Sequence, residues 1–264
     1  MRIVLIGAGN VATNLAKALC AKHEIVQIYS RTLANAKSLA DAVGCRNACC
    51  DLAAIATDAD FYIISVKDDA IASVVDAVPD NGAMWVHTSG SKPIDVFADH
   101  RSHYGVFYPM QSFSKQITVD FSEVPFFIEG SGEADADCIM ELARSLSHRV
   151  YAADSSTRRH LHVAAVFACN FANHVWAIAD EVLSEAGLPF DVMLPLIRTT
   201  VDKLDKLSPA DSQTGPAVRC DYNVISKHLS MLSGDNHEVY DTMTKSIIRF
   251  HNKRINNNNK NNQS

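Results

Sequence analysis

Hydrophobic residues follow two alternating patterns along the first half of the chain. Short apolar runs rich in β-branched residues predict strands at 3–6, 25–29, 61–66, 84–86 and 124–128. Between the early runs, apolar residues recur every three or four positions and predict helices over 11–21 and 33–42. Strands that alternate with helices are typical of a parallel sheet covered on both faces. The pattern therefore predicts an α/β fold with a doubly wound, mostly parallel sheet.

From about residue 153 the pattern becomes helical throughout. Asp154 offers an N-cap for a long apolar helix towards Glu185, and further helices are predicted over 192–207, 221–232 and 235–254. We expect two domains, a sheet domain over 1–152 and an all-helical domain over 153–255. The last nine residues, 256–264, include six asparagines and no apolar residue, which predicts a disordered tail.

Composition excludes several classes of protein. The chain has 47% hydrophobic and 20% charged residues and a net charge of −6, which argues against binding to nucleic acid. Its longest apolar run, Val163–Cys169, is far shorter than the roughly 20 residues that cross a bilayer, and Met1–Ile6 lacks the long apolar stretch of a signal peptide. We expect a cytoplasmic protein without membrane contact. Seven scattered cysteines without a CxxC pair predict neither disulfides nor a metal site.

A glycine-rich segment directly follows the first predicted strand. Gly7 permits a tight turn, Gly9 lets the backbone approach a pyrophosphate, and Ala12 keeps the next helix close to the strand. Asn10 and Val11 then begin the helix, whose N-terminus favours an anion. The arrangement predicts a dinucleotide site, and a glycine turn without a ligand is the alternative.

The residues after the second predicted strand indicate which dinucleotide binds. A site selective for NAD carries Asp or Glu about 20 residues past the glycines, where it binds the ribose hydroxyls. This chain has Ser30, Arg31 and Thr32 there and no carboxylate. A guanidinium with two hydroxyls suits the 2′-phosphate of NADP. We predict NADP as the cofactor, with a solvated loop arginine as the alternative.

Two later loops are predicted to reach the same edge of the sheet. Val66 and Lys67 end one predicted strand, and Thr88 and Ser89 follow the next. They are candidates for contacts with the nicotinamide ribose or a substrate carboxylate, because ligands of such sheets bind at the carboxyl ends of the strands. Thr88 could instead be a helix N-cap.

Polar residues interrupt the long apolar helix. Asn170 and His174 follow His162 by eight and twelve residues, with Asn173 beside them. Buried polar groups need partners, so these residues either satisfy one another inside a core or face a cleft. We favour the cleft, opposite the nucleotide site.

A second polar cluster surrounds Arg219, ahead of the helix predicted from residue 221. The planar guanidinium of Arg219 is a candidate for holding a substrate carboxylate, and Asp221 and His228 would share a helix face. Alternatively, Asp221 caps the helix and pairs with Arg219 at the surface.

The motifs resemble a known group of enzymes. The segments GAGNVA, SRT and VKDDAI resemble the NADP-binding Rossmann domain shared by pyrroline-5-carboxylate reductases, ketopantoate reductases and β-hydroxyacid dehydrogenases. The second domain of that group is helical, like the C-terminal domain of 6-phosphogluconate dehydrogenase. The segments HTSGSKPIDVF, FYPMQSFSK and LHVAAVFACNFANH are more closely similar to an uncharacterised bacterial family labelled NADP oxidoreductases, which joins a Rossmann-like domain to a helical domain of unknown function.

The resemblance implies roles for single residues. In β-hydroxyacid dehydrogenases a lysine four residues before an asparagine protonates the substrate; Asn170 is similar to that asparagine, but Val166 stands at the lysine position. His162 or His174 could replace the lysine, because histidine exchanges protons near neutral pH. The missing lysine also leaves open the reduction of an already protonated imine. Tyr108 and Gln111 in the FYPMQSFSK segment are expected to line the cleft.

The implied function is NADP-dependent hydride transfer between NADPH and a small carbonyl or imine substrate that carries a carboxylate. Arg219 or Ser89 would hold the carboxylate. The resemblance also implies a homodimer formed through the helical domain. The alternative is a protein that binds NADP(H) as a sensor or partner without catalysis.

Overall fold

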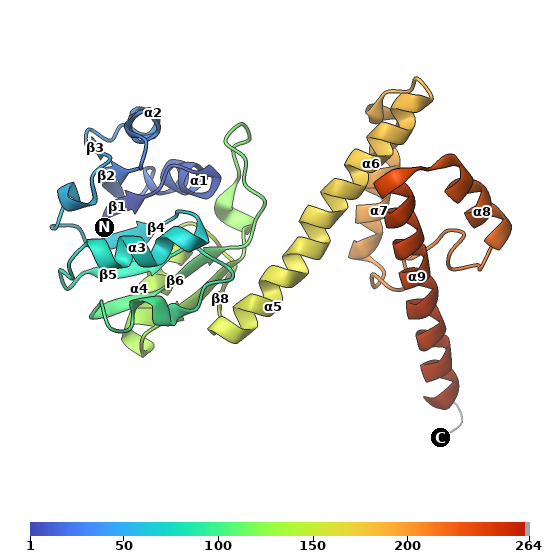
Figure 1. The fold of residues 1–264 in the computed structure, drawn as a ribbon. Helices are drawn as coiled ribbons and strands as arrows, with labels where there is room; N and C mark the ends of the chain where they lie inside the picture. The colour runs from blue at the N-terminus through green and yellow to red at the C-terminus, as the bar shows by residue number, and fades with distance from the viewer. Residues whose placement is uncertain (262–264) are drawn as a thin grey trace. The chain divides into compact units, whose positions relative to one another are not determined.

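The computed structural model describes residues 1–261, and the chain divides into two compact units (Figure 1). Met1–Phe171 forms the first unit, and the chain from Ala172 onward forms the second. The first unit contains one sheet of eight strands in the order β3-β2-β1-β4-β5-β6-β7-β8. The strands are β1 (Arg2–Ile6), β2 (Glu24–Tyr29), β3 (Ala48–Cys49), β4 (Phe61–Ile64), β5 (Met84–His87), β6 (His103–Pro109), β7 (Phe126–Gly130) and β8 (Val150–Ala152).

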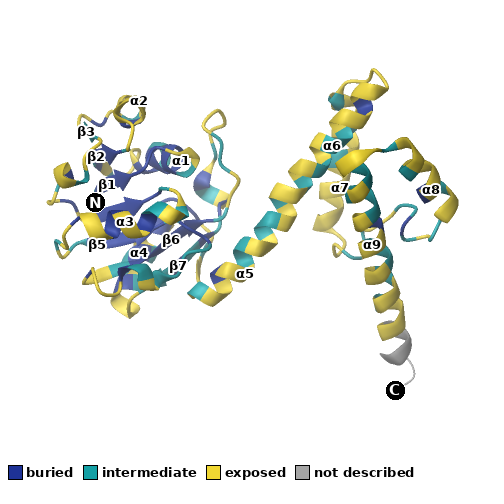
Figure 2. Cartoon of the chain, in the orientation of Figure 1, coloured by how far each residue is buried: buried dark blue, intermediate teal, exposed yellow. Residues whose placement is uncertain are grey.

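Helices cover both faces of this sheet, which confirms the predicted doubly wound fold. Ile3 and Leu5 of β1 pack on one face with residues of α1, α2 and α4, whereas Val4 and Ile6 pack on the other with residues of α3 and η3. The central strands β1, β4 and β5 are buried along nearly their whole length and are mostly apolar, because neither face of the sheet meets water (Figure 2). The helices that cover the two faces are α1 (Asn10–Leu19), α2 (Leu33–Val43), α3 (Ile71–Ala77) and α4 (Glu133–Arg144). The first unit also contains the short 3₁₀ turns η1 (Leu52–Ala54), η2 (Asp68–Ala70), η3 (Ile94–Phe97) and η4 (Phe121–Glu123).

Strand β6 has no counterpart among the strands predicted from the sequence. It contains Gly105 and ends at Pro109, two residues that interrupt the usual pattern of a strand. Gly105 is needed because a Cβ there would lie 2.2 Å from the carbonyl oxygen of Glu129 on β7. β6 and β7 run antiparallel, while all other neighbouring strands are parallel.

The predicted long helix is present, but a π-helical turn interrupts it. It consists of α5 (Ser155–Ala165), the π turn η5 (Val166–Phe171) and α6 (Ala172–Glu185), and Asp154 caps it by accepting a hydrogen bond of 2.7 Å from the Thr157 N–H. A π turn holds more residues than an α turn, so it changes the rotation between residues before and after it. Within the described residues, Ser155–Glu185 is long and apolar enough to cross a membrane by length and composition alone, which is weak evidence for a membrane span.

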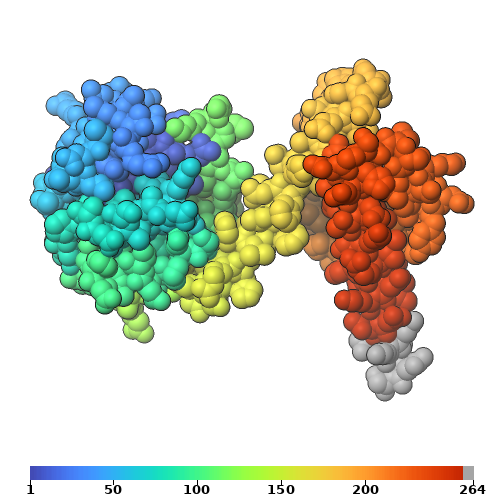
Figure 3. All heavy atoms as spheres, viewed as in Figure 1, coloured from blue at the N-terminus to red at the C-terminus, as the bar shows by residue number. Residues whose placement is uncertain are grey.

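The two compact units divide at the end of η5, whereas the predicted domain boundary follows residue 152. The difference arises because α5 is fastened to the sheet by a buried ion pair described below. In the space-filling view, the blue to green atoms of the sheet and its covering helices form one continuous body (Figure 3).

The second unit is helical, as the pattern predicts. It continues from α6 through η6 (Phe190–Met193), α7 (Leu194–Asp202), η7 (Lys203–Asp205) and α8 (Tyr222–Met231) to α9 (Gly234–Asn261). Disorder was expected from residue 256, but α9 extends to Asn261, and residues 262–264 lie outside the described part. Continuing a helix that already exists fixes one residue for each new hydrogen bond, so even asparagines can extend it.

Candidate active site

A cavity of about 1120 Å³ lies at the carboxyl edge of the sheet, and all residues that line it belong to the first unit. Its walls come from the segments that follow β1, β2, β4, β5 and β6, and from α5 and η5. The sheet order reverses between β1 and β4, and ligands of open α/β sheets bind at such a point. The cavity is somewhat larger than the pockets of about 300–1,000 Å³ that hold most small ligands. It therefore has room for a dinucleotide.

The glycine turn after β1 forms one end of the cavity. Gly7 has a φ of 135° and donates a 2.8 Å hydrogen bond to the carbonyl of Tyr29, and a Cβ at Gly7 would lie 2.1 Å from the carbonyl oxygen of Ser65. A Cβ at Gly9 would meet no atom within 4 Å, and no side chain caps α1. Among residues 1–261 no side chain therefore accepts the first N–H groups of α1, and Asn10 and Val11 line the cavity. This arrangement fits a pyrophosphate.

Arg31 and Ser30 line the cavity beside this turn. Arg31 is exposed and forms no ion pair within the described residues. Thr32, predicted as their companion, is instead the N-cap residue of α2 and does not line the cavity. The free guanidinium can receive a phosphate.

The segment after β6 crosses over to α1. Asn14, only 3% exposed, donates hydrogen bonds of 2.9 Å to the carbonyls of Asn10 and Ser114. Phe113 stacks on Phe121 at a ring distance of 5.6 Å. These contacts hold Lys115, an exposed residue, at the wall of the cavity.

Val66, Lys67, Thr88 and Ser89 all line the cavity, as expected for the loops after β4 and β5. The Thr88 hydroxyl donates to Ser65 Oγ at 3.2 Å and caps no helix. Ser89 Oγ accepts the N–H groups of the residues two and three positions later, at 3.1 and 3.0 Å. Ser89 therefore shapes its own turn.

His87 supports this turn from inside the protein. It is fully buried, accepts the Ser89 N–H at Nδ1 over 3.2 Å, and donates from Nε2 to the Pro93 carbonyl over 3.4 Å. Burial, with a smaller contribution from the charge of Arg158, lowers the pKa of His87 to about 4. The imidazole is therefore neutral at pH 7.

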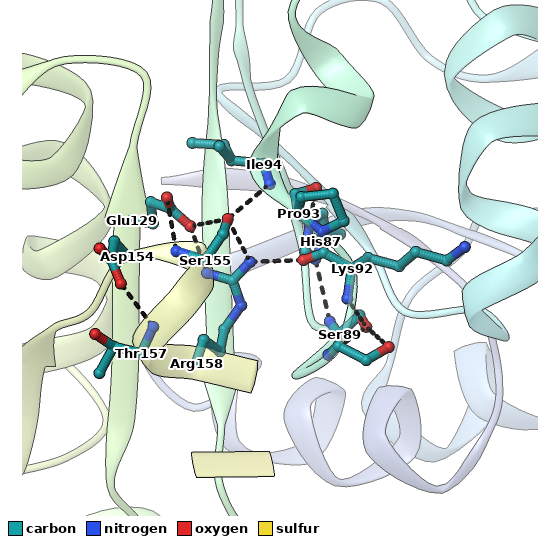
Figure 4. Close-up of polar contacts among 11 residues, drawn as sticks. His87, Ser89, Lys92, Pro93, Ile94, Glu129, Asp154, Ser155, Thr157 and Arg158 are labelled. Carbon is teal, nitrogen blue, oxygen red and sulfur yellow. Dashed lines mark hydrogen bonds and ion pairs between the residues drawn. The ribbon is translucent and has the colours of Figure 1, made fainter. Parts of the chain in front are cut away.

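Arg158, in the first turn of α5, joins three parts of the first unit (Figure 4). It is fully buried, pairs with Glu129 of β7, and donates 2.6 Å to the carbonyl of Lys92 in the loop after β5. Ser155 adds a 2.8 Å hydrogen bond from its hydroxyl to Glu129 and accepts the Ile94 N–H at 3.1 Å. α5, β7 and the loop are therefore held in fixed relation.

Tyr108 and His162 meet at the other end of the cavity. The Tyr108 hydroxyl lies 3.4 Å from His162 Nδ1, and the two rings lie edge to face. A Cβ at Gly90 would lie 2.7 Å from the Tyr108 ring and 2.8 Å from His162 Nδ1, so the loop backbone packs directly on this pair. Asn170 and Gln111 also line the cavity.

Two of the candidate catalytic residues lie elsewhere. His174 and Arg219 belong to the second unit, both are exposed, and neither lines this cavity. Asp221 caps α8 by accepting the Val224 N–H at 3.3 Å, and no ion pair with Arg219 forms within residues 1–261. His228 pairs with the Tyr240 hydroxyl at 2.8 Å, not with Asp221.

Sequence reasoning did not single out Arg158 or Glu129. Their one local signal is an arginine in the first turn of an apolar helix, where a basic residue opposes the helix dipole. Lys115 and Asn14 carried no signal of their own, since their contacts span about a hundred residues of chain.

Two family models match the chain. Residues 2–87 match the model described as NADP oxidoreductase coenzyme F420-dependent, and residues 124–247 match a domain of unknown function, DUF2520. No curated protein matches the chain.

Solved structures extend these similarities. A protein from Bacteroides fragilis assigned as an NADP oxidoreductase is 50% identical, with 94% of this chain and 98% of that one covered and a TM-score of 0.88. A reductive aminase from Aspergillus terreus, in complex with NADPH and ethyl-5-oxohexanoate, has a TM-score of 0.73 at 12% identity, covering 94% and 93% of the two chains. A 1-pyrroline-5-carboxylate reductase from Streptococcus pyogenes has a TM-score of 0.66 at 13% identity, covering 94% and 98%.

The last two similarities concern the fold, whereas the first extends to half of all residues over nearly the whole chain. With its glycine turn, doubly wound sheet and helical second unit, the chain therefore belongs to the NADP oxidoreductase family that joins an N-terminal Rossmann domain to a C-terminal domain of the DUF2520 type.

Proposed function

We propose that this protein is an NADP-dependent reductase or dehydrogenase that transfers hydride between NADPH and a small carbonyl or imine compound carrying a carboxylate. One observation carries the proposal. One and the same cavity has a glycine turn at one end, with Arg31, which forms no ion pair among the described residues, and the ring groups of Tyr108 and His162 at the other. A dinucleotide laid along the strand ends from β2 to β5 would reach both.

The residues at the first end fit NADP(H). The N–H groups at Gly9, Asn10 and Val11 would hold the pyrophosphate, and Arg31 with Ser30 the 2′-phosphate. Val66, Lys67 and Thr88 border the space for the nicotinamide ribose, with Ser89 shaping that wall. NADPH bound there supplies the hydride.

On the substrate side, Asn170 would orient the reacting group and His162 would take part in proton transfer. Arg219, predicted to hold the substrate carboxylate, is exposed in the second unit and does not line the cavity. Ser89 lines the cavity, and although its Oγ accepts two N–H groups, its hydroxyl proton could still be donated to a carboxylate, so Ser89 is our candidate. The exposed His174 would lie outside the chemistry.

The names of two structural neighbours support the substrate class. A reductive aminase and a 1-pyrroline-5-carboxylate reductase share this fold, and the latter is named for a cyclic imine with a carboxylate. Because fold alone does not determine function, this support concerns the kind of substrate only.

We extend the proposal to a cytoplasmic homodimer formed through the helical domain, which would then resemble that of 6-phosphogluconate dehydrogenase. Large apolar side chains in this part of the chain remain exposed, and such surfaces usually serve association. They include Leu196, Leu204 and Phe250.

The test is a fluorescence titration of the protein with NADPH and NADH. Removing Arg31 with Arg31→Ala deletes a charge-assisted phosphate contact worth roughly 1.5–3 kcal/mol, which is about tenfold or more in affinity. We expect tighter binding of NADPH than of NADH, and loss of the difference in the variant. Arg46→Ala, at an exposed arginine outside the cavity, is the matched control.

A panel of 2-oxo acids and cyclic imines, with NADPH oxidation followed by absorbance, tests the reaction itself. Oxidation with at least one compound supports the reductase. Tight NADPH binding with no oxidation by any of them would favour the sensor, and absence of binding of either nucleotide would overturn the proposal.

A further inference from the structure

Reduction of a carbonyl requires a proton as well as a hydride, and this site must supply it. Val166, at the position where the resemblance implies a lysine, lines the cavity and has no proton to give. We propose that the Tyr108 hydroxyl is the proton donor of this site and that His162 returns the proton to it. This inference rests on the function proposed above.

Tyr108 lies where a proton donor would be needed. Tyr108 is at the end of β6, the strand beside β5, and the loop after β5 is the wall expected to border the nicotinamide ribose. Gly90 of that loop leaves no room for a Cβ against the Tyr108 ring. The phenol therefore lies beside the part of the cavity in which hydride transfer would occur. Lys115 lies instead on the segment that is tied to α1, near the glycine turn.

Neighbouring contacts hold Tyr108 and His162 in place. The Tyr108 ring lies 6.3 Å from that of Phe127 on β7. His162 is one turn after Arg158, which fastens α5 both to Glu129 on β7 and to Lys92 in the same loop as Gly90. Donor, histidine and loop thus share one rigid frame, which a proton donor needs.

Tyr108 is also in the protonation state that a proton donor needs. Tyr108 is 9% exposed, and its burial raises the pKa of the phenol, opposed by the positive charge of Arg158. The hydroxyl therefore carries its proton at neutral pH. The buried guanidinium would also stabilise the phenolate that forms when the proton leaves.

Atoms and electrons balance in the proposed reduction. The substrate carbon accepts the hydride of NADPH, and the electron pair of the C=O or C=N bond moves to the oxygen or nitrogen. That atom takes the Tyr108 proton and becomes a hydroxyl or amine. The phenolate regains a proton from the solvent through the imidazole of His162, whose Nδ1 lies 3.4 Å away. One substrate, one NADPH and one proton give the reduced product and NADP⁺.

The test compares two probe substrates in the Tyr108→Phe variant. A 2-oxo acid such as 2-oxobutanoate needs a proton, whereas the N-methyl-1-pyrrolinium ion has a permanent charge and needs only hydride. We expect Tyr108→Phe to bind NADPH like the parent, to lose roughly 100- to 10,000-fold in turnover of the 2-oxo acid, and to retain its rate with the iminium ion. Tyr104→Phe, on the same strand and outside the cavity lining, is the matched control.

Other outcomes separate this inference from the proposed function. Equal losses with both probes would make Tyr108 a structural residue, and unchanged rates with both would remove it from the mechanism. A parent that reduces only the iminium ion needs no donor, which overturns the inference and leaves the reductase intact. A parent that oxidises NADPH with neither probe nor with any compound of the panel overturns both.

Discussion

The buried ion pair between Arg158 and Glu129 is the polar interaction whose loss we expect to destabilise the first unit most. The side chains are 1% and 16% exposed, and Glu129 also accepts hydrogen bonds from the N–H and the hydroxyl of Ser155 at 3.0 and 2.8 Å. Removing one charge leaves the other buried without its counterion, which usually costs about 3–5 kcal/mol. A glutamine keeps the shape of the side chain but only one acceptor oxygen, so it can still accept one of the two hydrogen bonds of Ser155. We therefore expect Glu129→Gln to lower the free energy of unfolding by about 3 kcal/mol.

The exposed pair of Arg149 and Glu123 provides a matched control. Its atoms lie 2.8 Å apart, but the side chains are 55% and 66% exposed. Solvent weakens such a pair, so Glu123→Gln should change the free energy of unfolding by less than about 1 kcal/mol.

The assay is urea unfolding followed by tryptophan fluorescence. Trp85 is fully buried in the first unit and Trp176 belongs to the second, so a Trp176→Phe background makes Trp85 the only reporter. Arg158→Met and the double variant complete a cycle. Because each single change leaves the other group buried without its counterion, removing both charges should cost less than the sum of the single changes, by about 1–3 kcal/mol. The reasoning is refuted if Glu129→Gln is no more destabilising than Glu123→Gln.

Two further predictions concern a lysine and a histidine. Lys115→Met should weaken NADPH and NADH binding by the same factor, because both nucleotides share the pyrophosphate. We expect about a fivefold loss of affinity, which corresponds to roughly 1 kcal/mol. A changed ratio of NADPH to NADH affinity, or an equal loss in the exposed control Lys37→Met, would contradict this. The unfolded chain protonates His87 near pH 6.5 but the folded protein only near pH 4, so the free energy of unfolding should fall by about 3 kcal/mol as the pH drops between these values. In His87→Gln that share of the pH dependence should be absent when urea unfolding is compared at pH 7 and pH 4.5.

Several features of the fold and the site could be predicted from the sequence because they depend on residues close together in the chain. The turn at Gly7 needs a conformation that glycine adopts most readily, and the cap at Asp154 joins residues three positions apart. The apolar runs of β1 and β4 indicate a sheet buried on both faces. Arg31 follows its strand directly, so its place at the cavity wall follows from the strand itself.

Other features depend on the tertiary structure. β6 becomes a strand because β5 and β7 lie on either side of it, although its glycine and proline argue against one. The π turn moves His174 around the helix axis relative to His162, which a regular helical spacing does not reveal. Tyr108 and His162 lie 54 positions apart in the chain, and Glu129 and Arg158 lie 29 apart. Strand register and helix packing decide such long-range pairs, and no local pattern of residues encodes either one.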